Sequence, residues 1–158
     1  MTADTQESAY FSVMDGDEIV HIARNGTNRA MNTGYILGSR VQAHVTAAGL
    51  LMLALREPAA LEHWLATNEL KAYTSFSIAG KEQLQVELAR VRSQGWALFE
   101  QQFELNYRGV AVPLRDRHGE VLGALRVTMP MGQESGEDAA ARVLSVLNET
   151  AQAMRHLI

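Results

Sequence analysis

The sequence predicts an α+β fold in which helices pack on an antiparallel sheet. Strand patterns come first, helical patterns follow, a second strand-rich stretch comes next, and one more helical pattern closes the chain. This order is typical of layered α+β domains. The 158 residues suit one domain with a core of its own. We expect residues 9–158 to form that domain, after a disordered lead or expression remnant over 1–8.

The composition excludes several kinds of site. The chain has no Cys, so it can hold neither a disulfide nor a thiolate zinc centre. A reducing cytoplasm is the natural compartment for such a chain. The net charge of −4 argues against a nucleic-acid-binding surface, which is usually basic. Neither a secretion signal nor an apolar run near the roughly 18 residues of a membrane span is visible, so no membrane partner is expected.

The first strands are predicted from a turn signal. The segment AYFSVMDGDEIVHIAR (9–24) has Asp-Gly at Asp15 between two apolar runs, which indicates a β-hairpin. Further strand is expected over 27–45, with turns at Gly34 and Gly38.

Three helical segments are expected in the middle of the chain. Thr46 is a good N-cap for a helix that runs through Leu55. Pro58 suits the first turn of a second helix. The segment GKEQLQVELARVRSQG (80–95) has the clearest helical periodicity, and Gly95 ends it. The apolar faces of the last two carry these residues: Leu61, Trp64, Leu65, Leu84, Leu88 and Val91.

Residues 96–130 are strand-rich, with a turn from Asp116 to Gly119. Aromatic residues recur every fourth position, which fits no uninterrupted strand, so we expect a bulge or loop between Gln102 and Asn106. The aromatic residues are Phe99, Phe103 and Tyr107, which are expected either in the core or as walls against an aromatic ligand.

A last helix is predicted after the strands. Ser135 and Asp138 resemble a capping box at its start. Its apolar residues recur with helical spacing: Val143, Leu144, Leu147, Ala151 and Met154.

Two features are candidates for a binding site. The helix that starts after Thr46 begins with Ala47, Ala48 and Gly49, whose small side chains leave the N-terminal N–H groups open to an anion. The same small residues would equally serve a helix packed tightly on the sheet. In GALRVTMP, one face carries Leu125, Val127 and Met129, and the other carries Ala124, Arg126 and Thr128.

The polar face of GALRVTMP allows two interpretations. Arg is seldom buried without a partner, so a solvent-facing row is the common outcome. The alternative is a pocket floor on which Arg126 holds a planar carboxylate by two hydrogen bonds.

The five histidines show no metal-ligand spacing, and we expect no metal, no cofactor and no catalytic residue. His44 lies just before Thr46 but has no nucleophile suggested nearby. We expect it to be a hydrogen-bonded structural histidine or one that lines a pocket.

Several segments, in this order, resemble the effector-binding domain of the IclR (isocitrate lyase regulator) family of bacterial transcription regulators. The spacing GSRxxxHxTAxGxxxLA is the most specific part. Two positions depart from the family pattern: Gln42 replaces a common proline, and Arg126 replaces a small or polar residue. The matching segments, which cover most of 10–158, are VMDGDEIVHIAR, LGSRVQAHVTAAGLLMLA, the threonine of YTSFSI, LARVRSQGWALFEQQFELNYRGVAVPLRDRHGEVLGALRVTMP and a closing helix.

The resemblance implies a GAF-like sensor domain that binds small carboxylates or aromatic acids. The segment RNGTNRAMN and the aromatic residues also resemble the branch that senses hydroxybenzoates. Family members contact DNA through an N-terminal winged helix-turn-helix domain that this chain lacks, so we expect a truncated regulator rather than a stand-alone sensor. Regulators with paired operators also imply a homodimer or homotetramer. The ligand-binding residues implied by the resemblance and the local patterns are Val41, His44, Thr46, Ala47, Ala48, Phe99, Tyr107, Gly109, Arg126 and Thr128.

Two other classes of function remain open from the sequence: a small enzyme on a GAF-like scaffold, and a dimerisation module with a filled core. The lack of Cys and of any base–nucleophile pair favours the sensor over the enzyme. Ligand-induced stabilisation would separate the sensor from the dimerisation module.

Overall fold

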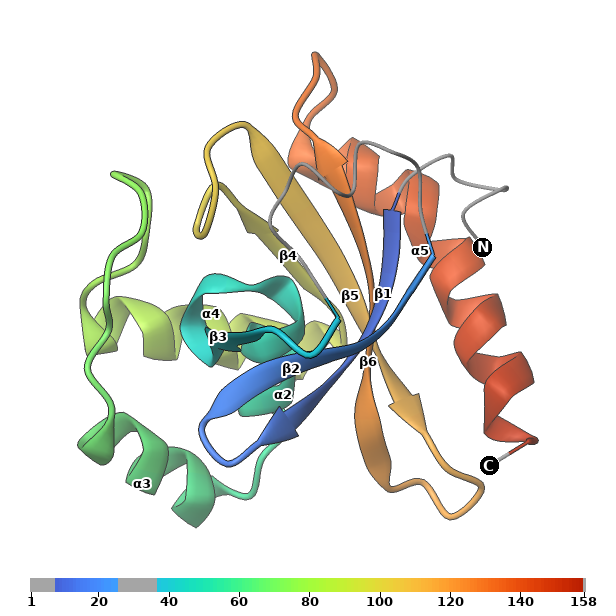
Figure 1. Cartoon of the computed structure of the whole chain (residues 1–158), viewed down its shortest axis with the longest axis horizontal. Helices are drawn as coiled ribbons and strands as arrows, with labels where there is room; N and C mark the ends of the chain where they lie inside the picture. The colour runs from blue at the N-terminus through green and yellow to red at the C-terminus, as the bar shows by residue number, and fades with distance from the viewer. Residues whose placement is uncertain (1–7, 26–36, 158) are drawn as a thin grey trace.

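The chain folds into a curled antiparallel sheet with helices on both faces, as a computed structural model that describes residues 8–25 and 37–157 shows (Figure 1). In these residues the sheet has six strands in the order β3-β2-β1-β6-β5-β4. All neighbouring strands run antiparallel. The predicted α+β class is therefore confirmed. The strands are β1 (Ser8–Asp15), β2 (Glu18–Asn25), β3 (Arg40–Gln42), β4 (Ala97–Glu100), β5 (Tyr107–Arg115) and β6 (Val121–Pro130).

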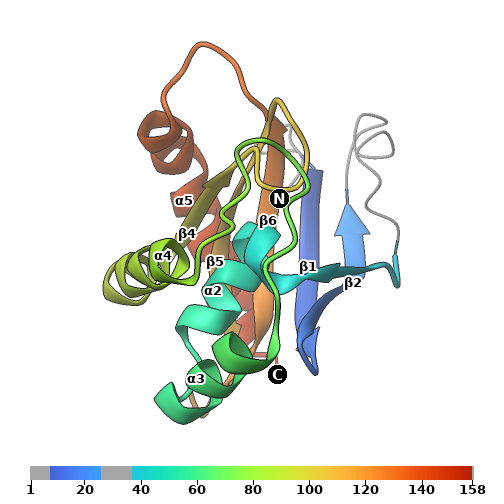
Figure 2. The ribbon, with the colours of Figure 1, turned by 90° about the vertical axis from the view of Figure 1, so that its left-hand side faces the viewer.

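Four α-helices lie within the described residues, with one short 3-10 turn, η2, before the first of them. Helix α2 packs against β4, β5 and β6 on one face of the sheet, with α4 behind it, and α5 packs against the same strands on the other face (Figure 2). The helical elements are η2 (Ala43–Val45), α2 (Ala47–Ala54), α3 (Pro58–Thr67), α4 (Lys81–Gln94) and α5 (Gly136–Arg155).

The turn and cap signals of the sequence are confirmed. The β1–β2 hairpin turns at Gly16, which has φ +64°. Gly95 ends α4 in the left-handed conformation, with φ +84°. Ser135 caps α5 by accepting a hydrogen bond from the N–H of Asp138. These residues set the β1–β2 turn, the end of α4 and the start of α5.

Of the stretch expected as strand over 27–45, only residues 37–45 are described, and most of these are not strand. Gly38 lies in a turn with φ +84°, but the strand is limited to Arg40–Gln42 and η2 follows it. The expected turn at Gly34 and the expected lead over 1–8 lie outside the described residues, apart from Ser8, which begins β1.

Two hydrophobic clusters lie on opposite faces of the sheet. The face toward α5 is apolar throughout β6, because Leu125, Val127 and Met129 pack with Val143 and Leu147 of the helix. The face toward α2 contains a second cluster, but the side chains of β6 on this face include a buried arginine and a buried threonine. The two buried polar side chains of β6, Arg126 and Thr128, therefore lie on the face toward α2.

Helix α2 lies very close to the η2 turn because its third residue is Gly49. A Cβ atom at Gly49 would lie 2.0 Å from the carbonyl oxygen of Ala43. Its N–H is already bonded to the Thr46 hydroxyl. The expectation that Gly49 leaves the backbone open to a ligand is therefore wrong, since this glycine serves packing.

We expect Gly49→Ala to destabilise the fold by about 3 kcal/mol or more, because the new methyl group meets backbone rather than a movable side chain. The same exchange in an exposed helix interior is normally stabilising by about 1 kcal/mol. Chemical denaturation measures the difference. As a control, Gly132→Ala should change stability by less than about 0.5 kcal/mol, since nothing lies within 4 Å of its added Cβ. Equal stability of the two variants would contradict the close approach of α2.

Candidate functional site

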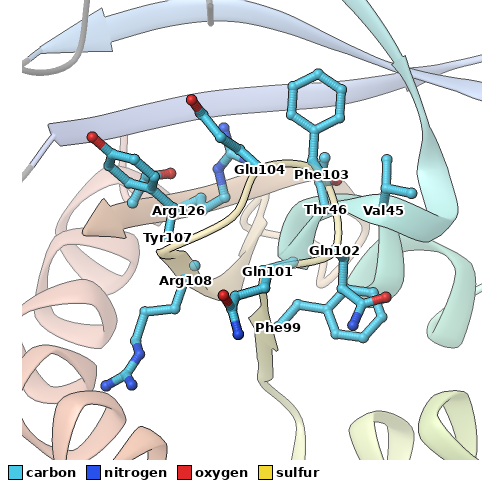
Figure 3. Close-up of a pocket in the computed structure, with 13 residues that line it drawn as sticks. Val45, Thr46, Phe99, Gln101, Gln102, Phe103, Glu104, Tyr107, Arg108 and Arg126 are labelled. Carbon is cyan, nitrogen blue, oxygen red and sulfur yellow. The ribbon is translucent and has the colours of Figure 1, made fainter. Parts of the chain in front are cut away.

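A pocket lies between the start of α2 and the adjoining ends of β4, β5 and β6, with an empty space of about 300 Å³ that includes open solvent (Figure 3). Seven of the residues expected to bind a ligand line it: Thr46, Ala47, Phe99, Tyr107, Gly109, Arg126 and Thr128.

The start of α2 is fixed by its cap. The Thr46 hydroxyl accepts a 2.8 Å hydrogen bond from the N–H of Gly49. The N–H groups of Ala47 and Ala48 precede the first helical carbonyl acceptor, so the helix itself gives them no partner. Ala47 borders the pocket, and the positive end of the helix dipole is therefore directed there.

Gly109 of β5 allows α2 and the Arg126 side chain to share one small space. A Cβ atom at this position would lie 3.4 Å from both the Cβ of Ala47 and the Cδ of Arg126. Those distances are at the short limit of ordinary van der Waals contact. Gly109 thus lies where the stem of Arg126 and the start of α2 come close to β5.

Arg126 forms the floor of the pocket. It is only 2% exposed, so the alternative of a solvent-facing row is wrong for this strand. Tyr10 of β1 lies opposite it in register, and the guanidinium carbon is 4.8 Å from the centre of the Tyr10 ring. This cation–π contact holds the buried guanidinium in one place.

Behind Tyr10 the polar row continues into β1 and β2. The His21 ring lies 5.6 Å from the Tyr10 ring. His21 Nδ1 and Ser12 Oγ share a hydrogen bond of 2.8 Å. Burial, and to a smaller extent the positive charge of Arg126, lower the pKa of His21 to about 3. His21 is therefore neutral at physiological pH and adds no second positive charge beside the arginine.

Thr128 lies two residues after Arg126 on the same face of β6. It is 6% exposed, and its hydroxyl has no hydrogen-bond partner among the described residues. A buried hydroxyl without a partner is costly, which makes Thr128 a natural contact for a polar group in the pocket.

The wall of the pocket opposite α2 is the loop between β4 and β5, residues 101–106. Gln101 and Asn106 both adopt positive φ, at 57° and 68°. The N–H of Gln101 closes the loop on the carbonyl of Tyr107 at 2.8 Å. The loop predicted between Gln102 and Asn106 is therefore confirmed, and it includes Gln101 as well.

The segment before α4 ties this loop in place. The Thr74 hydroxyl donates to the carbonyl of Gln101, and the Ser77 hydroxyl donates to that of Gln102 at 2.5 Å. The Gln102 side chain accepts from the N–H of Ile78 at 2.8 Å and donates to the carbonyl of Phe76 at 2.9 Å. These bonds fix the loop backbone that carries Phe103 and Glu104 to the pocket.

Glu104 is a pocket residue that the sequence patterns did not indicate. Its Oε2 atom is inaccessible to solvent and has no hydrogen-bond partner among the described residues. Burial raises the pKa of its carboxyl group. The aromatic spacing predicted the loop but not which of its side chains would face inward. The other lining residues outside the predicted set are Val45, Gln101, Gln102, Phe103 and Arg108.

Arg108 borders the pocket, but its guanidinium group is engaged elsewhere, as Figure 3 shows by its direction. It forms an ion pair with Glu100 at 2.8 Å. It also donates to the carbonyls of Glu134 and Ser135, where α5 begins. Arg108 therefore serves the α5 side of the sheet.

Three predicted ligand residues are not part of the pocket lining. Val41 packs in the hydrophobic cluster under α2, and Ala48 is fully buried in the same cluster. His44 Nε2 lies 2.8 Å from the carbonyl of Lys71, and its ring packs against Trp64. Its ring is thus directed toward α3 and the segment after it, and burial lowers its pKa.

In the described part of the chain, no cluster of three or more His, Cys, Asp or Glu side chains could hold a metal ion. None of the helices in residues 8–25 and 37–157 is long and apolar enough to span a membrane.

Comparisons with known proteins cover almost the whole chain. The family described as "Bacterial transcriptional regulator IclR C-terminal" matches residues 1–156. The Pca regulon regulatory protein of Pseudomonas putida is 32% identical over 151 residues, 95% of this chain and 52% of that protein. The Pca operon regulatory protein of Acinetobacter baylyi is 31% identical over 160 residues, 98% of this chain and 58% of that protein. The chain thus spans about half the length of these curated relatives.

Among solved structures, the inducer-binding domain of the PobR transcription factor from Acinetobacter is similar throughout. The structure is of a double mutant in complex with 3-hydroxybenzoic acid. It superposes with a TM-score of 0.89 at 26% identity and covers 99% of this chain and 92% of that one.

The two pocket threonines should respond oppositely to the same substitution. Thr46→Val removes the cap of α2 and should cost about 1 kcal/mol of folding stability. Thr128→Val keeps the shape and removes a buried hydroxyl without a described partner, so stability should stay equal or rise by up to about 1 kcal/mol. Denaturant unfolding with unchanged slopes measures both. A loss at Thr128 as large as that at Thr46 would show that its hydroxyl is bonded in the free protein.

His21 should make folding stability depend on acid pH. Its pKa is about 3 in the fold against an ordinary value of 6.5, so below pH 6.5 the unfolded chain gains a proton that the folded chain does not. Stability should therefore fall by up to about 1.4 kcal/mol per pH unit between pH 6.5 and pH 3. His21→Gln should lose less stability than the unchanged protein between pH 6.5 and pH 5. As a control, His63→Gln at an exposed position should lose as much stability over this pH range as the unchanged protein. If stability falls equally with pH in all three proteins, His21 is not held neutral in the fold.

Proposed function

Because the chain belongs to the IclR family of bacterial transcriptional regulators and corresponds to its C-terminal domain, we propose that it senses an aromatic carboxylic acid of the hydroxybenzoate class and relays its binding to a DNA-binding domain. The observation that carries this proposal is Arg126, a buried guanidinium on the floor of a pocket.

The polar groups around Arg126 suit a carboxylate. A guanidinium matches the two oxygens of a carboxylate with a pair of parallel hydrogen bonds. The N-terminus of α2 adds favourable potential for an anion from the side of Ala47. The Thr128 hydroxyl offers one more donor. These contributions come from two different elements, so they converge only in the folded domain.

The apolar groups suit a ring. Phe99, Phe103 and Tyr107 line the same pocket, and Phe103 is steadied by Tyr73, whose ring centre lies 5.1 Å away. Aromatic side chains favour offset or edge-to-face contacts with a second ring. The relatives support this choice: the PobR domain was solved with 3-hydroxybenzoic acid.

The matched family consists of transcription regulators, not enzymes, and we propose no chemical step for this pocket. We propose that DNA contact in the whole protein is made by a separate N-terminal domain and that the protein works as a homodimer or homotetramer. The acidic balance of this chain agrees with a domain that does not itself contact phosphates.

Arg126→Met tests the proposal. The variant keeps most of the packed stem but removes the charge-assisted pair, so affinity for a hydroxybenzoate should fall about 10- to 150-fold. Affinity for the corresponding neutral amide should change far less, because it lacks the anion. Arg126→Lys should recover only part of the loss, since an ammonium cannot make the two-pronged contact. Titration calorimetry of acid and amide against the three proteins measures this. Equal losses for both ligands would assign Arg126 to pocket shape, and an unchanged affinity for the acid would place the carboxylate elsewhere.

A further inference from the structure

The carboxylate of Glu104 is the polar group in the pocket that carboxylate recognition does not explain. It comes from the β4–β5 loop, whereas Arg126 comes from β6 (Figure 3). Thr128 belongs to β6 as well. Its buried oxygen accepts no hydrogen bond, and no ion pair joins it to a cation, among the described residues. A ligand carboxylate cannot satisfy it, because like charges repel.

A buried acceptor of this kind favours an occupant that brings a donor. An oxygen removed from water without a partner carries a desolvation cost, and burial raises the pKa of Glu104 accordingly. A hydroxyl group on the ligand would remove that cost by donating a charge-assisted hydrogen bond. The pocket thus combines hydrogen-bond donors on β6, which suit an anion, with the Glu104 acceptor on the loop, which suits a hydroxyl group.

The backbone of the loop that carries this acceptor is held in place before any ligand arrives. Its ends are set by the left-handed residues Gln101 and Asn106, and the Asn106 N–H donates to the Gln101 side chain at 3.1 Å. The bonds from Thr74 and Ser77 hold the other side of its backbone. An acceptor fixed in this way discriminates more strongly than a mobile one, because binding does not have to order it.

We propose that Glu104 is the residue that distinguishes hydroxylated aromatic acids from unsubstituted ones, by accepting a hydrogen bond from the ring hydroxyl of the ligand. The same carboxylate also orients the ligand, because it repels the end that Arg126 attracts. This inference rests on the proposed function, since it assumes an aromatic acid in the pocket.

The test compares ligands that differ only at the ring. Benzoate, 3-hydroxybenzoate, 4-hydroxybenzoate and the methoxybenzoates are titrated into the unchanged chain, Glu104→Gln and Glu104→Leu. In the unchanged chain at least one hydroxybenzoate should bind about 10- to 150-fold more tightly than benzoate, the range expected for a hydrogen bond to a charged group. The matching methoxybenzoate, which has an oxygen but no donor, should bind no better than benzoate.

Glu104→Leu should abolish the preference and leave benzoate affinity equal or higher, whereas Glu104→Gln, which keeps an oxygen acceptor without the charge, should retain part of it. Glu120→Gln is the matched control: it removes one exposed carboxylate beside the β5–β6 turn, at the other end of β5, and should leave all affinities unchanged. Thermal unfolding of each variant shows that the fold is kept.

The outcomes separate the two proposals. Equal binding of benzoate and both hydroxybenzoates by the unchanged chain would overturn the role of Glu104 and leave the aromatic-acid proposal standing. Equal loss of all the acids in the folded Glu104→Leu variant would also overturn it, because Glu104 would then support the loop rather than read the ligand. Failure of every acid to bind the unchanged chain would overturn the proposed function, and this inference with it.

Discussion

The structure depends on how closely the first turn of α2 approaches the sheet. Two glycines make that approach possible. Gly49 lets the helix approach the η2 turn, where a Cβ atom would collide with the Ala43 carbonyl. Gly109, which has no side chain, lies close to both Ala47 and Arg126. A helix start held at that distance places Ala47 at the edge of the pocket. The pocket is therefore a consequence of packing, because the same contacts that bury α2 also create the positive end of the site.

The two faces of the sheet show how such a site coexists with a stable core. Toward α5, β6 contributes only apolar side chains, and the helix closes over them. Toward α2, the same strand buries an arginine and a threonine. That burial is tolerated because the Tyr10 ring stacks on the guanidinium and because His21 remains neutral beside it. The apolar α5 face stabilises the fold. The α2 face contributes less to stability, because it buries the polar side chains of Arg126 and Thr128.

The sequence predicted the parts of this fold that depend on local signals. The Asp-Gly turn after β1, the Thr46 cap and the alternation in β6 are each decided within a few residues, and the structure has all three. Residues whose placement depends on distant partners were not predictable in this way. The His44 ring forms a hydrogen bond with the Lys71 carbonyl and is not part of the pocket lining. Glu104 lines the pocket from a loop whose residues Gln101 and Asn106 adopt a left-handed conformation that favours glycine. Small residues at the start of α2 could not reveal whether packing or a ligand required them, and here Gly49 serves packing while Ala47 borders the pocket.

Arg108 and Arg126 show why position on a strand decides the role of an arginine. They lie on neighbouring strands, but Arg108 pairs in register with Met129 and Arg126 with Ala111, so their side chains project to opposite faces. Arg108 reaches the start of α5, where Glu100 and two carbonyls engage its terminal N–H groups. Arg126 reaches the α2 face, where its guanidinium carbon lies 4.8 Å from the centre of the Tyr10 ring. The alternation of the strands thus separates the two arginines: Arg108 anchors the start of α5, whereas Arg126 lies on the α2 face at the pocket.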